Sequence, residues 1–230
     1  MKEFLTQSVY FGLVISFIGY EIGLLLKKKF KTALMNPLLI ASAFVIGVLL
    51  VLDVDYDTYN NGARYLSYFL TPATVSLAIP LYRQLAILKK YPFAIFGGIA
   101  AGVLTAMVSI YLLALGFDLT HEQYVTLLPK SVTTAIGMGV SDKMGGIVTL
   151  TVVAISITGI IGNVLAELLL KLFRIKEPVA KGLAIGTAAH ALGTTKAMEM
   201  GEVEGAMSSL AIVVAGIMTV VSVSVFAKLI

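Results

Sequence analysis

The sequence contains no cysteine among its 230 residues. This absence excludes disulfide bonds, cysteine metal sites and thiol catalysis, and it leaves the redox compartment undetermined. The motifs of soluble enzymes are missing as well, because the chain has no GxGxxG, no Walker A sequence, no HExxH and no nucleophile elbow. We therefore expect no enzymatic activity and no cofactor. Without an ATP site, any transport would be driven by a gradient or by a partner.

Charged residues are also scarce. They make up 13% of the chain, whereas about 25% is usual in soluble domains, and 58% of the residues are hydrophobic. The mean hydropathy of +0.95 predicts an all-α membrane protein. A helix needs about 20 apolar residues to cross a bilayer, and the runs that meet or approach this length are residues 4–26, 36–52, 93–117, 144–170 and 205–227. We interpret the first as a true helix, because it lacks the small-residue cleavage site of a signal peptide.

The basic residues cluster at the ends of these runs, so the net charge of +4 does not indicate nucleic-acid binding. Clusters at 27–31, 83–90 and 171–181 are expected in the cytoplasm, and the acidic residues at 53–57 and 118–122 outside it. If residues 129–141 crossed the membrane, the last basic cluster would lie outside. We therefore expect that segment to be re-entrant or a broken helix, within about seven to eight membrane segments.

Residues 129–139 read PKSVTTAIGMG, a proline-started and threonine-rich segment that favours a short half-helix over a continuous lipid-facing one. Residues 72–80, PATVSLAIP, share part of this pattern, and Thr133-Thr134 is echoed by Thr194-Thr195. Such echoes are typical of the inverted repeats of secondary transporters. Recurrence of common residues by composition alone is the open alternative.

Residues 182–202 read GLAIGTAAHALGTTKAMEMGE and place a histidine and a lysine in a segment long enough to enter a bilayer. An intramembrane cation indicates a functional site, because burying charge in hydrocarbon is costly. Glycines permit bending or close approach, and threonines supply hydroxyl groups. The two interrupted segments together predict an anion site in the membrane, formed by Lys130, Ser131, Thr133, Thr134, Thr187, His190, Gly193, Thr194, Thr195 and Lys196.

Structural alternatives stay open for these residues. His190 would then hydrogen-bond a neighbouring carbonyl in a packed bundle, and Lys130 and Lys196 would extend to the interface. The GxxxG pattern at Gly98 and Gly102 indicates close helix packing. The glutamates at 199, 202 and 204 are expected to form a solvated charge run in the loop before the last span.

The motif PKSVTT, the glycine pair at 145–146 and GLAIGTAAHALGTTKAMEMGE followed by GAMSSLA resemble the LrgB/CidB family of bacterial membrane proteins, whose plant relative is the chloroplast glycolate/glycerate translocator. The resemblance covers nearly the whole chain and implies a single integral membrane domain over residues 1–230. One departure is Ala135, where the family commonly has proline, and this leaves the geometry of the break open.

The resemblance implies two functions. Some members look like secondary carriers of small monocarboxylates such as pyruvate, glycolate or glycerate, and this is the function we expect. The alternative is a holin- or antiholin-like regulator of murein hydrolase activity and autolysis. The implied partners are a small carboxylate substrate, an LrgA/CidA-type membrane protein and the lipid bilayer, with a homo-oligomer as an open alternative and no nucleic acid. The implied location is the cell membrane, with multiple passes.

Overall fold

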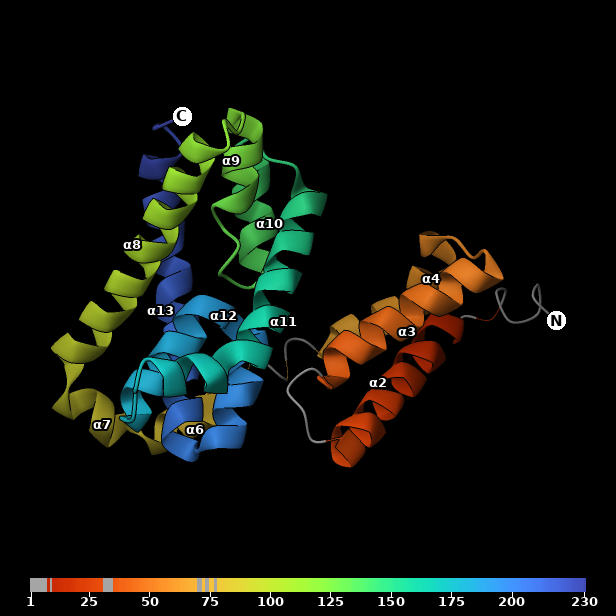
Figure 1. The fold of residues 1–230 in the computed structure, drawn as a ribbon, viewed down its shortest axis with the longest axis horizontal. Helices are drawn as coiled ribbons and strands as arrows, with labels where there is room; N and C mark the ends of the chain where they lie inside the picture. The colour runs from red at the N-terminus through yellow and green to blue at the C-terminus, as the bar shows by residue number, and fades with distance from the viewer. Residues whose placement is uncertain (1–7, 9, 31–34, 70–71, 73–74, 77) are drawn as a thin grey trace. The chain divides into compact units, whose positions relative to one another are not determined.

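The computed structural model describes residues 8, 10–30, 35–69, 72, 75–76 and 78–230. Every regular element in these ranges is a helix, which confirms the all-α prediction (Figure 1). The chain divides into two compact units, Met1–Ser76 and Leu77–Ile230, and each is described by itself. The echo predicted at residues 72–80 includes residues 73, 74 and 77, which lie outside the described set.

The first unit is a pair of apolar helices followed by short polar ones. Asn36 starts the second apolar helix, because its Oδ1 accepts a hydrogen bond from Leu38 N at 2.9 Å. That helix confirms the predicted segment 36–52, and the predicted first span is helical from Phe11, with residues 4–7 and 9 outside the described set. The helices are α2 (Phe11–Phe30), α3 (Pro37–Leu52), α4 (Tyr56–Ala63) and the 3-10 helix η1 (Arg64–Phe69).

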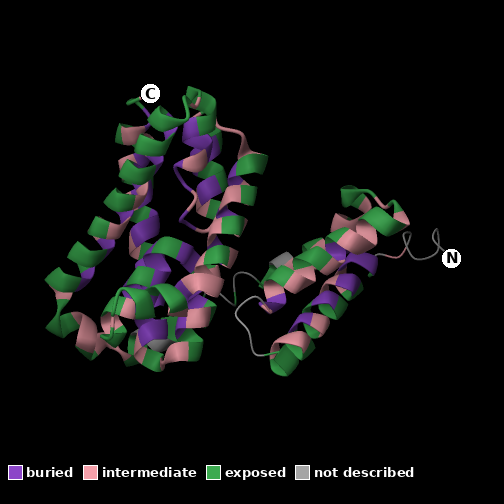
Figure 2. Cartoon of the chain, in the orientation of Figure 1, coloured by how far each residue is buried: buried purple, intermediate pink, exposed green. Residues whose placement is uncertain are grey.

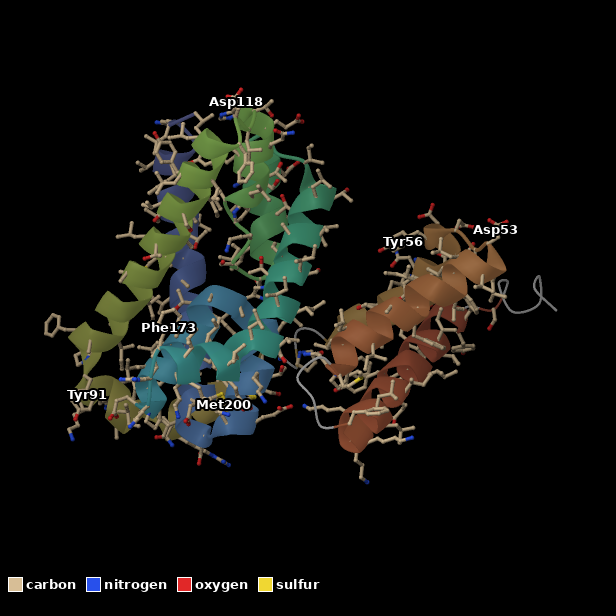
Figure 3. All side chains as sticks on the ribbon, viewed as in Figure 1. Asp53, Tyr56, Tyr91, Asp118, Phe173 and Met200 are labelled. Atoms are coloured by element: carbon tan, nitrogen blue, oxygen red, sulfur yellow. The ribbon has the colours of Figure 1, made fainter. Side chains whose placement is uncertain are left out.

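The second unit is a helical bundle with two recognisable ends. We call the end with Tyr91 and Met200 the base, and the end with Asp118 the top (Figure 3). Its helices are α6 (Ala78–Arg83), α7 (Leu85–Lys90), α8 (Pro92–Gly116), α9 (His121–Leu127), α10 (Thr134–Lys143), α11 (Val148–Leu172), α12 (Pro178–Met200) and α13 (Glu202–Phe226). Helices α8 and α13 run from base to top, and α11 returns to the base (Figure 1).

The core of this unit lies between α8, α12 and α13. Buried residues recur along one face of α8 every three or four positions, as expected for a helix that packs on one side: Ile95, Ile99, Val103, Met107, Ile110 and Ala114. Gly98 and Gly102 lie next to this stripe, and a Cβ at Gly102 would lie 2.6 Å from Cγ2 of Thr187. The GxxxG pattern therefore packs α8 against α12 within the chain. Figure 2 shows the buried positions of these helices in purple.

Residues 121–143 form a hairpin that opens at the top, in which α9 leads into the bundle and α10 leads back (Figure 1). Between them, residues 128–133 are non-helical, which confirms the predicted interruption. A network of hydroxyl groups holds the two arms beside the start of α11: Thr151 Oγ1 lies 2.9 Å from Thr126 O and 2.7 Å from Ser141 Oγ. The last turns of α9 and of α10 thus both contact the start of α11. The connection between them is largely buried, at residues 128, 129, 131 and 132.

Helix α12 is a second hairpin, which opens at the base. Its backbone breaks at His190, where φ is 43° and ψ is −139°. Residues on both arms contact the first turns of α13, because Gly182 packs against Glu204 O while a Cβ at Gly205 would lie 3.2 Å from Met198 Cα. The predicted break in residues 182–202 is confirmed, although it falls at a histidine between Gly186 and Gly193 rather than at a glycine.

Within the described ranges, three helices are long and apolar enough to cross a membrane by length and composition: Pro92–Gly116, Val148–Leu172 and Glu202–Phe226. They match the predicted runs 93–117, 144–170 and 205–227 to within a few residues. Their outward faces expose large apolar side chains, among them Leu112 on α8, Leu168 on α11 and Ile217 on α13. An apolar surface of this extent is unfavourable in water and is suited to contact with lipid.

The predicted solvated loop at residues 199–204 is wrong. Glu199 lies in α12, whereas Glu202 and Glu204 lie in the first turn of α13. The Glu204 side chain is buried, and its carboxylate lies 3.8 Å from Lys181 Nζ. Only Gly201 separates the two helices, so a glutamate that sequence places before the last span instead begins it, close to the helix N-terminus that favours negative charge.

We predict that cysteines replacing Glu122 and Lys143 are labelled from the same side of the membrane, because the α9–α10 hairpin returns to the end at which it starts. Lys176→Cys should be labelled from the opposite side. A membrane-impermeant maleimide on intact cells gives the measurement, and the absence of native cysteine removes background. Labelling of Glu122→Cys and Lys143→Cys from opposite sides would contradict the hairpin.

Candidate functional site

The tips of the two hairpins meet at one residue of α11, Ile155. The ring nitrogen Nε2 of His190, at the tip of α12, lies 3.0 Å from Ile155 O. From the other hairpin, a Cβ at Gly137 would contact the Ile155 side chain and would lie 3.5 Å from Pro129 O. The two interrupted segments that the sequence singled out are therefore neighbours inside the bundle, between the base and the top.

His190 occupies this position at a cost in backbone energy. A non-glycine residue with a positive φ is strained, typically by roughly 1–3 kcal/mol. The imidazole is buried and packs on α11, where a Cβ at Gly159 would lie 2.7 Å from His190 Cε1. The hydrogen bond to Ile155 matches the structural alternative considered for His190, and the same geometry also places the ring at the hairpin tip.

Lys130 and Ser131 lie in the non-helical connection of the other hairpin. Lys130 Nζ donates a hydrogen bond to Ser131 Oγ at 2.9 Å, and the ammonium group is within electrostatic range of His190. Ser131 is buried and Lys130 is partly buried. Among the described residues no carboxylate pairs with Lys130, so its partner is a neutral hydroxyl. This leaves a partly buried positive charge without a counter-ion in the described chain.

Each hairpin also directs a helix N-terminus at the meeting point. Thr133 is the N-cap residue of α10 and Thr134 its first residue, and the Thr133 side chain makes no capping hydrogen bond. The second arm of α12 begins after His190. The first amide groups of a helix have no partner four residues earlier, and they carry partial positive charge. Each hairpin thus has a helix N-terminus next to its tip, and Lys130 lies in the connection of the first hairpin.

Gly193 and Thr194 hold the α12 hairpin closed. A Cβ at Gly193 would lie 2.6 Å from Ala189 Cβ and 3.2 Å from Ile185 O, so only glycine permits the approach of the two arms. Thr194 Oγ1 donates to His190 O at 2.9 Å and lies 2.7 Å from Ser208 Oγ on α13. These two predicted residues therefore hold the two arms of the hairpin together next to its tip.

Three predicted residues lie away from the tips. Thr187 faces Gly102 on α8, and its buried Oγ1 has no hydrogen-bond partner among the described residues. Thr195 is exposed and accepts a hydrogen bond from Asn163 Nδ2 at 3.0 Å. Lys196 lies nearer the base, where its Nζ is 2.6 Å from Glu167 Oε1. Lys196 therefore joins α12 to α11 and has its charge compensated there.

Sequence reasoning missed several residues that build the site. Ile155 carries no chemical signal, because its role is to present a backbone carbonyl. Ser208 was within the quoted GAMSSLA motif, although its pairing with Thr194 depends on the hairpin. Asn163 donates to Leu192 O at 2.7 Å across the helix interface. Of these residues, Asn163 could have been identified from the sequence, because it is a lone amide side chain in an apolar run.

Membrane-length helices that surround two hairpins with polar tips define an α-helical membrane protein with an internal polar centre. The model of the LrgB-like family matches residues 16–229, and the chain belongs to that family. The chain is 43% identical to the antiholin-like protein LrgB of Bacillus subtilis (strain 168) over 226 residues, which cover 98% of each chain. It is 43% identical to that of Bacillus mycoides (strain KBAB4) over 222 residues, 96% of each. No solved structure matches the chain.

We predict that His190→Gly unfolds at a higher temperature than His190→Ala. Both variants lose the imidazole and its hydrogen bond, so their difference reports the backbone. In a continuous helix, a protein with alanine is more stable than one with glycine by about 1 kcal/mol. At the backbone angles of His190 we expect the opposite order, with a difference of similar size, because glycine adopts these angles without strain. Thermal unfolding in detergent gives the comparison. Ala188→Gly on the first arm of α12 is the control, and it should lower the thermal midpoint. A lower midpoint for His190→Gly than for His190→Ala would contradict the break.

Proposed function

We propose that the chain carries small monocarboxylates across the cell membrane and binds them where the two hairpin tips meet. The observation that carries this proposal is Lys130, a partly buried ammonium group with no carboxylate partner among the described residues. A cation in that position is unfavourable unless an anion compensates it. One small carboxylate would do so and would accept hydrogen bonds from the adjacent helix N-termini.

The arrangement of the hairpins supports a carrier over a simple pore. One opens at the top and the other at the base, as in transporters built from inverted repeats with broken helices at the membrane midplane. Counting the two hairpins, the three crossing helices of the second unit and the apolar helices α2 and α3 of the first unit, the protein would have seven membrane segments, within the expected range of about seven to eight. Access to the tips would alternate between the two ends as one hairpin and then the other moves.

The charge and the hydrogen-bond donors of the site limit the substrate class. The tips offer one lysine and neutral donors, namely Ser131 and the hydroxyl groups of Thr133 and Thr134, which suits one negative charge. His190 is buried within the same centre and adds a group that can exchange a proton. Pyruvate, glycolate and glycerate each combine one carboxylate with a carbonyl or hydroxyl group that such donors can bind.

A second candidate function is antiholin-like regulation of murein hydrolase activity and autolysis. The names of the relatives from Bacillus subtilis and Bacillus mycoides favour this function over carboxylate transport. It would involve an LrgA/CidA-type membrane partner or further copies of the chain. The two functions are compatible, because a change in carboxylate flux would alter the physiology of the envelope.

Uptake by the purified protein in liposomes tests the proposal. We expect accumulation of radiolabelled pyruvate, glycolate or glycerate above protein-free liposomes, with the same measurement repeated after adding the partner. Release of a large, uncharged fluorescent dye from the same liposomes distinguishes a hole from a carrier. Dye release without selective carboxylate uptake would overturn the carrier proposal and favour the antiholin-like function.

A further inference from the structure

A basic cavity lies at the base of the second unit, apart from the hairpin tips. It has a volume of about 450 Å³, within the usual range for small-ligand sites, and it lies where α11 ends and α12 begins. Four cations and two carboxylates line it: Lys171, Arg174, Lys176, Lys181, Glu167 and Glu204. The lining therefore carries an excess of two positive charges.

The carboxylates are already engaged on the rim of this cavity. Glu167 lies 2.6 Å from Lys196 and 3.6 Å from Lys171, and Glu204 lies 3.8 Å from Lys181. Arg174 and Lys176 have no ion pair within the part of the chain that the structure describes. These two side chains therefore supply the uncompensated charge of the cavity.

Arg174 occupies a backbone position that normally belongs to glycine. Its φ is 56°, and it follows the last turn of α11, where Ile175 N donates to Leu170 O at 2.9 Å. Such a left-handed position at a helix C-terminus is usually glycine, because other residues are strained there. The chain contains 21 glycines but has arginine at this position.

The surroundings fit a phosphate at the membrane surface. Leu170 and Ile175 line the same cavity as the cations, and α11 is of membrane length and ends at Leu172. Basic pockets between membrane helices bind anionic headgroups, and the arginine fork pairs with phosphate oxygens through parallel hydrogen bonds. We propose that this cavity is a binding site for a phosphate-bearing anion, with Arg174 and Lys176 as its principal contacts. The phosphate comes from a lipid headgroup or from a soluble phosphate.

Binding measurements on the full chain test the site and separate its two sources. One arm reconstitutes the protein in phosphatidylcholine nanodiscs containing phosphatidylglycerol or cardiolipin and measures retained lipid by native mass spectrometry. The other arm titrates inorganic phosphate in detergent and follows the thermal midpoint. A response in the first arm alone identifies a lipid, and a response in the second identifies soluble phosphate.

The double variant Arg174→Gln/Lys176→Gln should bind the responding phosphate source about tenfold more weakly, a loss of roughly 1.4 kcal/mol. Lys89→Gln/Lys90→Gln removes the same charge from the last turn of α7 and should bind like the wild type. Arg174→Gly separates binding from folding, because it should raise the midpoint without phosphate and still weaken binding. Equal binding by wild type and double variant, or no response of the wild type in either arm, would overturn the site.

Discussion

Lys130→Gln is expected to abolish carboxylate uptake and to remove the thermal stabilisation that carboxylates give to the wild type. Glutamine keeps most of the length and the hydrogen-bonding capacity of lysine but removes the charge that would neutralise the substrate. A hydrogen bond to a charged group contributes about 1.5–3 kcal/mol, so we expect affinity to fall by one to two orders of magnitude. Liposome uptake and a thermal-shift panel of monocarboxylates give the two measurements.

The matched control is Lys143→Gln, which removes an exposed lysine from the other end of α10 on the same hairpin. It should leave both the uptake and the thermal shift unchanged. Wild-type behaviour of Lys130→Gln in both assays would sink the proposed site, even if uptake itself is confirmed. No carboxylate effect on the wild type would instead favour the antiholin-like function.

The second large effect is expected from Gly193→Leu. Even one added carbon at this position would lie 2.6 Å from Ala189 Cβ and 2.9 Å from Ile185 Cγ2, so leucine forces the arms of α12 apart. Overpacking of this kind costs about 3 kcal/mol. The thermal midpoint in detergent and the yield of monodisperse protein should both fall. Carboxylate uptake should be lost, because the tip at His190 would be displaced.

Gly98→Leu makes the same change on an exposed position of α8. The nearest atom to a Cβ at Gly98 would be Leu183 Cδ1 at 3.6 Å, which is an ordinary van der Waals distance. We expect its free energy of unfolding to stay within about 0.5 kcal/mol of the wild-type value. If Gly193→Leu is as stable and active as Gly98→Leu, the closed hairpin is wrong.

The sequence was most informative where one residue type determines the outcome. Long apolar runs predict the membrane-length helices, because about 20 consecutive apolar residues are the length that crosses the hydrocarbon core as a helix. Pro129 and the threonines after it indicated the interruption before α10, because proline and paired hydroxyl groups disfavour a continuous apolar helix. The imbalance of basic clusters gave an independent reason for the same interruption. The interruption was therefore predictable from the sequence, whereas the choice between a re-entrant hairpin and a broken crossing helix was left open.

What the sequence could not provide depends on contacts between distant segments. The break in α12 falls at His190 and not at the flanking glycines, because the imidazole is anchored by Ile155 O on another helix. Lys196 was grouped with the site, but Glu167 lies within reach only after α11 and α12 pack. Glu204 likewise looked like part of a loop, because nothing in a linear run shows that Lys181 lies beside it.

The lengths of the hairpin arms have an electrical consequence. Helix α10 has 10 residues, and the second arm of α12, residues 191–200, is equally long, so each rises about 15 Å. Their summed rise of about 30 Å equals the thickness of the hydrocarbon core, so hairpins that enter from opposite sides would have their tips near the electrical midpoint of the membrane. A potential of 100 mV changes the energy of a unit charge by about 2.3 kcal/mol across the whole membrane. A lone carboxylate would meet about half of this on entering and half on leaving, whereas a carboxylate accompanied by a proton would meet none. The voltage dependence of uptake therefore reports the net charge that crosses the membrane in each transport cycle.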